Sequence, residues 1–204
     1  LGEKRRRRFY LGEYSDDSEG ALWKRDWIIR HRVESVSDLT RVVVAVDPAV
    51  TGNETSDDTG IIVVGSKTID GKEHYYVIDD FTYHGDVTGW GQSVIDAYRR
   101  HSADLVVAET NQGGDLVEMN IRNYDRSIKF KKVTATRGKA LRAEPIANLY
   151  DMGLVHHVGN FLELEDELCM WTPEDKESPN RLDALVWGVT YLSGRGSGTY
   201  SVGR

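Results

Sequence analysis

Residues 42–47, VVVAVD, and residues 105–109, LVVAE, decide the fold, because each is a short apolar run that ends in a carboxylate. Unbroken apolar and β-branched runs of this length are typical of strands that are buried on both faces of a sheet. Pro48 keeps Asp47 extended and ends the first strand there. Functional sites of open α/β sheets form outside the carboxyl ends of the strands. If the two strands are parallel neighbours, Asp47 and Glu109 lie side by side.

The elements around these two strands alternate as they do in an α/β domain. Residues 61–67 and 74–81 read as two strands joined by a tight turn at Asp70-Gly71, so part of the sheet is antiparallel. A further strand is expected at residues 128–133. Apolar residues recur at helical spacing in five segments, which are residues 89–101, 113–124, 144–151, 161–170 and Ser178-Pro179 to Leu192. The sequence predicts one α/β domain with a mixed sheet and helices on both faces.

Two helix starts are marked by proline. Ser178 and Pro179 are expected to be the N-cap and the first residue of the last helix. Pro145 best fits the first turn of the helix at residues 144–151, and an earlier start near Gly138 stays open.

Asp183 is the third acidic residue that this pattern places at the strand ends. It is expected in the second turn of the last helix, three and four residues before Val186 and Trp187, at the edge of an apolar stripe. A helix packed on the sheet by that stripe directs Asp183 towards Asp47 and Glu109. Three carboxylates at one site repel one another, and Mg²⁺ or Mn²⁺ is the expected compensation. Carboxylate-only two-metal sites suit in-line displacement at phosphorus.

Composition excludes several classes of protein. The chain has 204 residues, one cysteine and a net charge of −7. It can form no intramolecular disulfide, fits a reducing intracellular compartment, and has no apolar run near the roughly 18–20 residues of a membrane helix. Residues 1–34 hold 9 basic and 7 acidic side chains, and the remainder is strongly acidic. Such a domain is poorly suited to broad phosphate contact unless metal ions neutralise its carboxylates.

The chain divides into three parts. Residues 1–40 do not look like core, since they contain the basic run Arg5–Arg8, an acidic segment and room for one small helix. We expect residues 1–40 to be a connector, residues 41–193 to be the α/β domain, and the Gly/Ser-rich residues 194–204 to be a flexible tail.

Five stretches together carry a resemblance to a known family. They are LGEYSDDSEGALWKRDWI, VVVAVDPAVTGNETSDDTGIIVVG, VVAETNQGGDLV, the run at residues 142–171, and SPNRLDALVWG. With them the chain resembles, over most of residues 10–193, the C-terminal nuclease domain of the large terminase subunit of tailed bacteriophages. The resemblance implies a ribonuclease H-like fold and metal-dependent cleavage of double-stranded DNA during viral genome packaging.

The resemblance also implies roles for particular residues. The family's catalytic acids carry over onto Asp47, Glu109 and Asp183, which would hold two Mg²⁺ or Mn²⁺ ions. A further metal-binding acid in the loop after the first strand corresponds to Asp58, with Asp57 beside it as another candidate.

The same resemblance implies partners for the whole family protein. These are an N-terminal packaging ATPase domain, the portal and the small terminase subunit, in the host cell cytoplasm and away from membranes. This chain has no G-x-x-x-x-G-K-[ST] loop, so the ATPase activity is not expected of it.

Arg137, Lys139 and Arg142 form a basic stretch before a predicted helix. They are candidates for contact with DNA phosphates, and an ordinary solvated surface is the alternative.

Two other functions stay open. Another ribonuclease H-like nuclease, such as a junction resolvase, would prefer branched DNA and act as a dimer, so duplex and four-way-junction substrates separate it from a terminase nuclease. A non-catalytic DNA-gripping module would use the acids structurally, and metal-dependent cleavage that is lost in Asp47→Ala would eliminate it.

Overall fold

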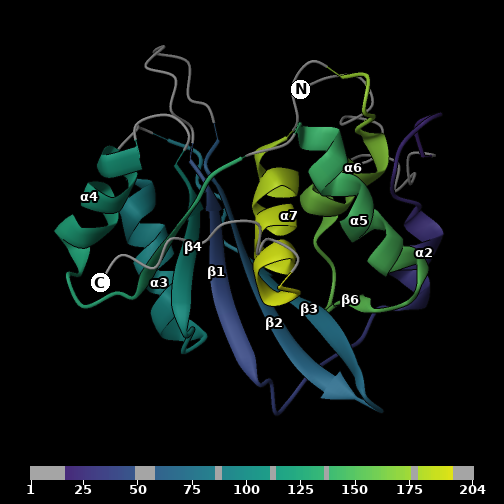
Figure 1. The fold of residues 1–204 in the computed structure, drawn as a ribbon, viewed down its shortest axis with the longest axis horizontal. Coiled ribbons are helices and arrows are strands. Elements are labelled where there is room, and N and C mark those ends of the chain that lie inside the picture. Colours follow the sequence, from purple (N-terminus) through teal and green to yellow (C-terminus); the bar gives the residue numbers. More distant parts are fainter. Residues whose placement is uncertain are drawn as a thin grey trace.

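A six-stranded mixed sheet forms the centre of the protein, with strand order β5-β4-β1-β2-β3-β6 (Figure 1). The computed structural model describes residues 17–48, 58–85, 89–110, 114–135, 138–175 and 179–194. The strands are β1 (Arg41–Asp47), β2 (Gly60–Ile69), β3 (Lys72–Asp80), β4 (Leu105–Glu109), β5 (Phe130–Val133) and β6 (Val155–His157). The helices are α2 (Arg25–Arg30), α3 (Trp90–Arg100), α4 (Gly114–Tyr124), α5 (Lys139–Asp151), α6 (Leu162–Met170) and α7 (Asn180–Leu192).

Strand pairing confirms the predicted mixed sheet. β1 is parallel to β4 and antiparallel to β2, which in turn forms a hairpin with β3. Asp70 and Gly71 both have positive φ at the hairpin turn, as the twist of the two strands requires. β6 adds a short parallel strand beside β3, which the predicted order of elements does not include.

Helices cover both faces of the sheet, also as predicted (Figure 1). On one face α7 lies against β1 and β2, with α2, α5 and α6 outside it, and their apolar side chains form one core cluster. On the other face α3 and α4 pack with side chains of β1, β2 and β4 in a second cluster.

The connector contributes to the core, so the expectation that residues 1–40 lie outside it is wrong for part of the segment. The predicted small helix is α2, and the side chains of Trp23 and Ile28 are fully buried in the core cluster under α5 and α6. Burial of large apolar side chains stabilises by about 1.5–3 kcal/mol each, which explains why this segment docks. The run Arg5–Arg8 lies outside the described residues.

The expected place of Pro145 in a first turn is wrong, and the alternative of an earlier start near Gly138 is the one observed. α5 begins at Lys139, after Gly138 as N-cap, so Pro145 lies inside the helix. A proline there costs roughly 3 kcal/mol, because it loses a backbone hydrogen bond and crowds the preceding turn. Burial of Ala143, Ile146 and Tyr150 along the same helix offsets that cost.

The last helix differs slightly from its predicted start. α7 begins at Asn180 with Pro179 at the N-cap position, and Ser178 lies outside the described residues. Asp183 is therefore in the first turn of the helix and not the second.

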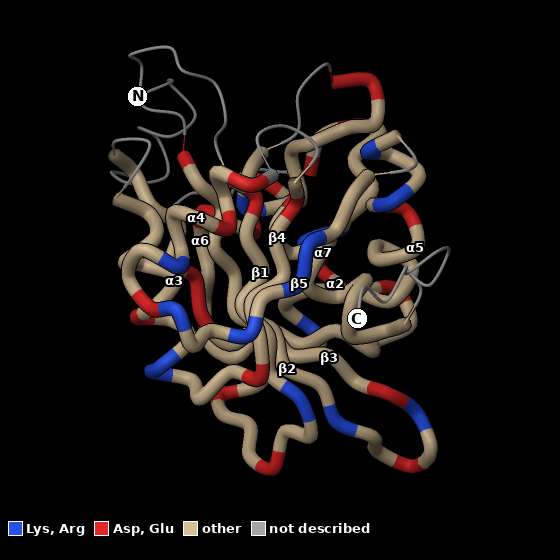
Figure 2. The backbone as a smooth tube through the Cα atoms, turned by 60° about the vertical axis from the view of Figure 1, so that its left-hand side comes forward, with Lys and Arg blue, Asp and Glu red and all other residues tan. Residues whose placement is uncertain are grey.

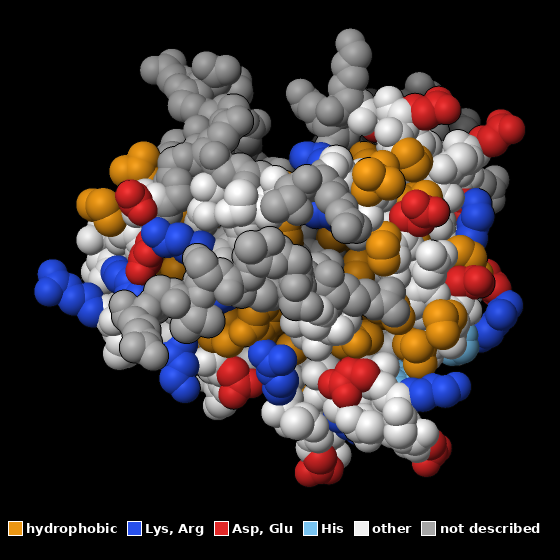
Figure 3. Space-filling model, viewed as in Figure 1, with side chains coloured by type: hydrophobic (Ala, Val, Ile, Leu, Met, Phe, Trp, Pro, Cys, Tyr) orange, Lys and Arg blue, Asp and Glu red, His pale blue; other side chains and the backbone are white. Residues whose placement is uncertain are grey.

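Charged residues of both signs are interspersed over the described part of the fold. Red and blue segments alternate along the backbone in Figure 2, and on the face drawn in Figure 3 the Lys and Arg side chains stand among Asp and Glu. Among the described residues, none of the helices is long and apolar enough to cross a membrane.

Candidate active site

Asp47 and Glu109 lie next to each other at the carboxyl ends of two parallel strands. Val46 of β1 pairs with Ala108 of β4, so the acid that follows each of them ends its strand at the same edge. Both acids are half-buried, whereas the apolar residues before them are fully buried. The pattern of a buried run and a terminal carboxylate thus places two acids together as predicted.

Close packing of α7 on the sheet brings the third acid to this edge. Gly60 pairs with Asp47 across β1 and β2, and a Cβ on Gly60 would lie 2.0 Å from the backbone oxygen of Asn180. Farther along α7, a Cβ on Gly188 would lie 3.0 Å from Cβ of Ala45. Only glycine allows the helix to approach so closely, and its first turn therefore places the buried Asp183 near Asp47.

The three carboxylates influence one another electrostatically. Burial raises the pKa of Asp47 well above its ordinary value, and the neighbouring charges of Asp183 and Glu109 raise it further. Lys139 and Arg142 act in the opposite direction and lower this pKa. Like charges that share one site disfavour the ionised form, so the metal-free site carries an electrostatic cost.

Lys139 and Arg142 lie beside Asp183. Lys139 Nζ donates a hydrogen bond to Asp183 Oδ2 at 2.9 Å, and Arg142 Nη2 lies 4.0 Å from Asp183 Oδ1. The Lys139 side chain is 50% exposed, but that of Arg142 is only 10% exposed. Both residues were singled out by the sequence as DNA contacts, and the structure places both at the acidic site. Arg137 lies outside the described residues.

Trp187 contacts Glu109, which the sequence does not reveal. Its indole Nε1–H donates a hydrogen bond to Glu109 Oε2 at 2.7 Å. The guanidinium carbon of Arg142 lies 4.7 Å from the centre of the Trp187 ring. The only sequence signal is the spacing of four residues between Asp183 and Trp187, which puts both on one face of α7.

Asp58 lies two residues before β2. Its carboxylate is hydrogen-bonded to Nδ1 of His84, and its Oδ2 lies 4.0 Å from Arg181. The side-chain amide of Asn180 donates to its backbone oxygen, which ties this loop end to the start of α7. Asp57, the neighbouring candidate, lies outside the described residues.

Arg181 forms a second charged cluster at the base of α7, which sequence reasoning also missed. The side chain is buried, and its guanidinium donates to Asp80 Oδ2 and Glu167 Oε1, both at 2.9 Å, and to Glu163. Burial raises the pKa of Glu167 to about 7, although Arg181 lowers it and Asp80 raises it. The cluster joins α7 to β3 and α6 two residues from Asp183.

The donor set at the strand ends fits a divalent metal that prefers oxygen ligands. It consists of carboxylates from three separate elements, and one of them has a strongly raised pKa. As arranged, however, no group of three or more His, Cys, Asp or Glu side chains in the described parts of the chain could hold a metal ion. Lys139 Nζ donates to Asp183 Oδ2, an oxygen that a metal ion at this site would also use.

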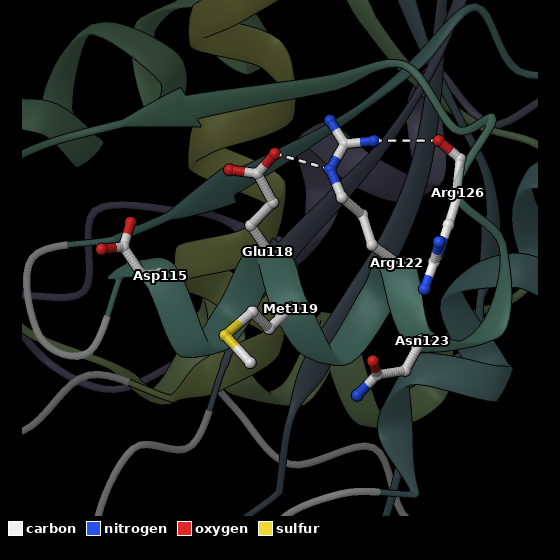
Figure 4. A pocket seen from close by; sticks show the side chains of 6 residues that line it. All are labelled: Asp115, Glu118, Met119, Arg122, Asn123 and Arg126. Carbon is white, nitrogen blue, oxygen red and sulfur yellow. Dashed lines mark hydrogen bonds and ion pairs between the residues drawn. The ribbon is translucent and has the colours of Figure 1, made fainter.

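A surface hollow of about 590 Å³ lies elsewhere, along α4 (Figure 4). Its lining includes Asp115, Met119 and Asn123, together with an ion pair between Glu118 and Arg122. None of the predicted site residues within the described ranges lines it.

Comparison with known families decides the relationship. The family described as "Terminase RNaseH-like domain" matches residues 44–192, which is most of the chain and includes all three acids. The chain belongs to this family. No curated protein sequence matches it closely enough to count as a relative.

Solved terminase structures share the fold of this terminase RNaseH-like domain. The large terminase of a thermophilic bacteriophage is 15% identical with a TM-score of 0.61; the match covers 95% of this chain and 52% of that one. The nuclease domain of the large terminase subunit gp2 of bacterial virus Sf6 is 14% identical with a TM-score of 0.57, covering 81% and 96% of the two chains. A variant of the Sf6 domain with manganese and beta-thujaplicinol is 13% identical with a TM-score of 0.55, covering 81% and 96%. The chain thus spans about half the length of the thermophilic phage protein.

Proposed function

We propose that this chain is a metal-dependent endonuclease that cleaves double-stranded DNA during viral genome packaging, as the nuclease domain of a large terminase subunit. The observation that carries the proposal is the meeting of Asp47, Glu109 and Asp183 from β1, β4 and α7 at one edge of the sheet. Membership of the terminase RNaseH-like family supports it, as does the manganese in the structure of the related Sf6 domain.

Asp47, Glu109 and Asp183 would hold Mg²⁺ or Mn²⁺, two ions in all, with Asp58 as a further candidate ligand. Divalent metal bound at such a site supplies an activated water and stabilises the departing oxygen of a phosphodiester. Asp47 lies between the other two acids, since β1 pairs with β4 and α7 approaches along β2. It is therefore the residue we expect to contact both ions.

The chain's own residues prepare the acids for this role. Trp187 donates its indole N–H to Glu109, and Lys139 donates to one oxygen of Asp183. Because the Lys139 side chain is half-exposed, its ammonium can also turn to a phosphate of bound DNA. Arg142, which also lies beside Asp183, lowers the negative potential of the site as well.

Contact with DNA rests on few side chains in this proposal. The net charge of −7 and the interspersed charges in Figures 2 and 3 favour weak binding by the domain alone. Arg137, Lys139 and Arg142 are the proposed contacts at the site. A packaging ATPase domain, a portal and a small terminase subunit would supply further affinity in the virus-infected cell's cytoplasm.

Cleavage of plasmid DNA by the wild type, three site variants and one control variant tests the proposal. The wild type should nick and linearise duplex DNA when Mn²⁺ or Mg²⁺ is added, whereas Asp47→Ala, Glu109→Ala and Asp183→Ala should each lose the activity at saturating metal. Asp26→Ala is the matched control, because Asp26 is an exposed acid whose partner is Arg30 one helical turn away. Wild-type activity in any of the three site variants would remove that residue from the site, and preference for a four-way junction over duplex would contradict the terminase assignment.

A further inference from the structure

Trp187 is a tryptophan of α7 whose indole N–H is committed to an acid of the candidate site. The Nε1–H to Glu109 Oε2 distance of 2.7 Å is at the short end for N–H···O bonds, as is usual when the acceptor is a carboxylate. Glu109 ends β4, whereas Trp187 is in the second turn of α7, so the bond joins the sheet to the helix that carries Asp183.

The Trp187 ring also contacts a guanidinium group. The Arg142 guanidinium is stacked over the ring at 4.7 Å from its centre, and the same guanidinium lies 4.0 Å from Asp183. Trp187 is only 6% exposed. The buried ring thus contacts Arg142 of α5 with its face and Glu109 of β4 with its N–H.

Other tryptophans of the core lack such a partner. The indole nitrogens of Trp23 and Trp171 are buried and make no hydrogen bond to any described residue. Trp171 is 4% exposed and lies in the same core cluster as Trp187. Trp23 and Trp171 show that a tryptophan can pack in this core without a hydrogen bond from its indole N–H. Apolar packing alone therefore does not explain why the Trp187 N–H is hydrogen-bonded to a carboxylate of the site.

We infer that Trp187, whose ring contacts Arg142, is a positioning residue that holds the Glu109 carboxylate in the orientation needed for metal binding. The inference rests on the proposed function. A carboxylate held by a donor on one oxygen presents its remaining lone pairs in a defined direction, and loss of an outer-shell partner of this kind usually costs about 10- to 100-fold in metal affinity or activity.

Trp187→Phe removes the N–H and keeps an aromatic ring under Arg142, and Trp171→Phe is the matched control for shrinking a buried tryptophan. For Trp187→Phe, the Mn²⁺ concentration that gives half-maximal cleavage should rise about 10- to 100-fold, with kcat at saturating Mn²⁺ within about threefold of wild type. The Mn²⁺ concentration that half-saturates the increase in melting temperature should rise by the same factor. Trp171→Phe should leave both concentrations unchanged.

Equal metal requirements in Trp187→Phe, Trp171→Phe and the wild type would overturn the inference and leave the proposed nuclease intact. A wild type that neither cleaves DNA nor gains stability with Mn²⁺ would overturn both.

Wild-type protein alone provides a second measurement, which does not depend on the folding of a variant. The indole N–H resonance of Trp187, assigned through its backbone, should shift during a titration with Mg²⁺, because the acceptor carboxylate gains a cation. The indole resonance of Trp171 should stay in place. A Trp187 resonance that stays in place at saturating Mg²⁺ would contradict the inference.

Discussion

Replacing Arg181 should destabilise the protein more than any change to a surface ion pair. The guanidinium is buried and contacts Asp80, Glu163 and Glu167, whose side chains remain 16%, 43% and 21% exposed. Removing one partner of a fully buried ion pair costs about 3–5 kcal/mol. Since water reaches these carboxylates in part, we expect Arg181→Met to cost about 2–3 kcal/mol.

For a domain of this size, each 1 kcal/mol lowers the melting temperature by roughly 2–4 °C, so the expected fall is about 4–12 °C. Arg30→Met is the matched control, because Arg30 and Asp26 form an exposed pair on α2. Pairs of this kind contribute about 0.3–0.5 kcal/mol, which corresponds to a change of no more than about 2 °C.

The stability lost in Arg181→Met should depend on pH, and the pKa of Glu167 determines in which direction. Its folded-state pKa of about 7 is raised above the ordinary value of 4.5, so protonation of Glu167 stabilises the fold and this contribution is lost as pH rises through about 7. Without Arg181, which lowers this pKa, the unneutralised carboxylates should repel most at high pH. The deficit of Arg181→Met should therefore be larger at pH 8 than at pH 6.

Thermal melts of wild type, Arg181→Met and Arg30→Met at the two pH values measure these differences. If Arg181→Met melts within 2 °C of the wild type at pH 8, or if its deficit is larger at pH 6, the electrostatic account of this cluster is wrong.

Three further predictions concern the candidate active site. Asp47→Asn should abolish cleavage yet raise the melting temperature without metal. Because the pKa of Asp47 is raised in the folded state, the stability that the protonated side chain contributes is lost as pH rises above its unfolded value near 3.8. The difference in melting temperature between Asp47→Asn and the wild type should therefore widen with pH, and a difference that narrows would contradict this. Lys139→Met should lower the Mn²⁺ concentration for half-maximal thermal stabilisation by about three- to tenfold, because metal no longer competes with an ammonium for Asp183. If Lys139→Met needs more Mn²⁺ than the wild type, Lys139 assists metal binding. Asp58→Ala should reduce cleavage less than loss of Asp47 does, since His84 already engages its carboxylate; complete loss of cleavage would make Asp58 an essential ligand.

The sequence predicts the frame of the site because that frame depends on local patterns. A buried run that ends in an acid specifies where Asp47 and Glu109 sit, and the apolar stripe of α7 specifies which way Asp183 faces. Strand alternation and turn chemistry give the hairpin of β2 and β3 in the same way. These signals span only a few residues, so they can be recognised in a single sequence.

The contacts that tune the site have no local signal. Trp187 reaches Glu109 across 78 residues, and Arg181 reaches Asp80 across 101. No periodicity links such positions, so an indole of α7 reads as ordinary core. Pro145 shows the reverse case, because a strong local signal for a helix start gives way to burial of the helix that contains it.

Anomalous diffraction from a crystal soaked in Mn²⁺ would show whether Asp47, Glu109 and Asp183 are metal ligands. We expect manganese peaks bonded to oxygens of all three side chains, with the Lys139 ammonium withdrawn from Asp183. The contradicting result is a saturating soak in which no peak touches Asp47 and Lys139 stays on Asp183.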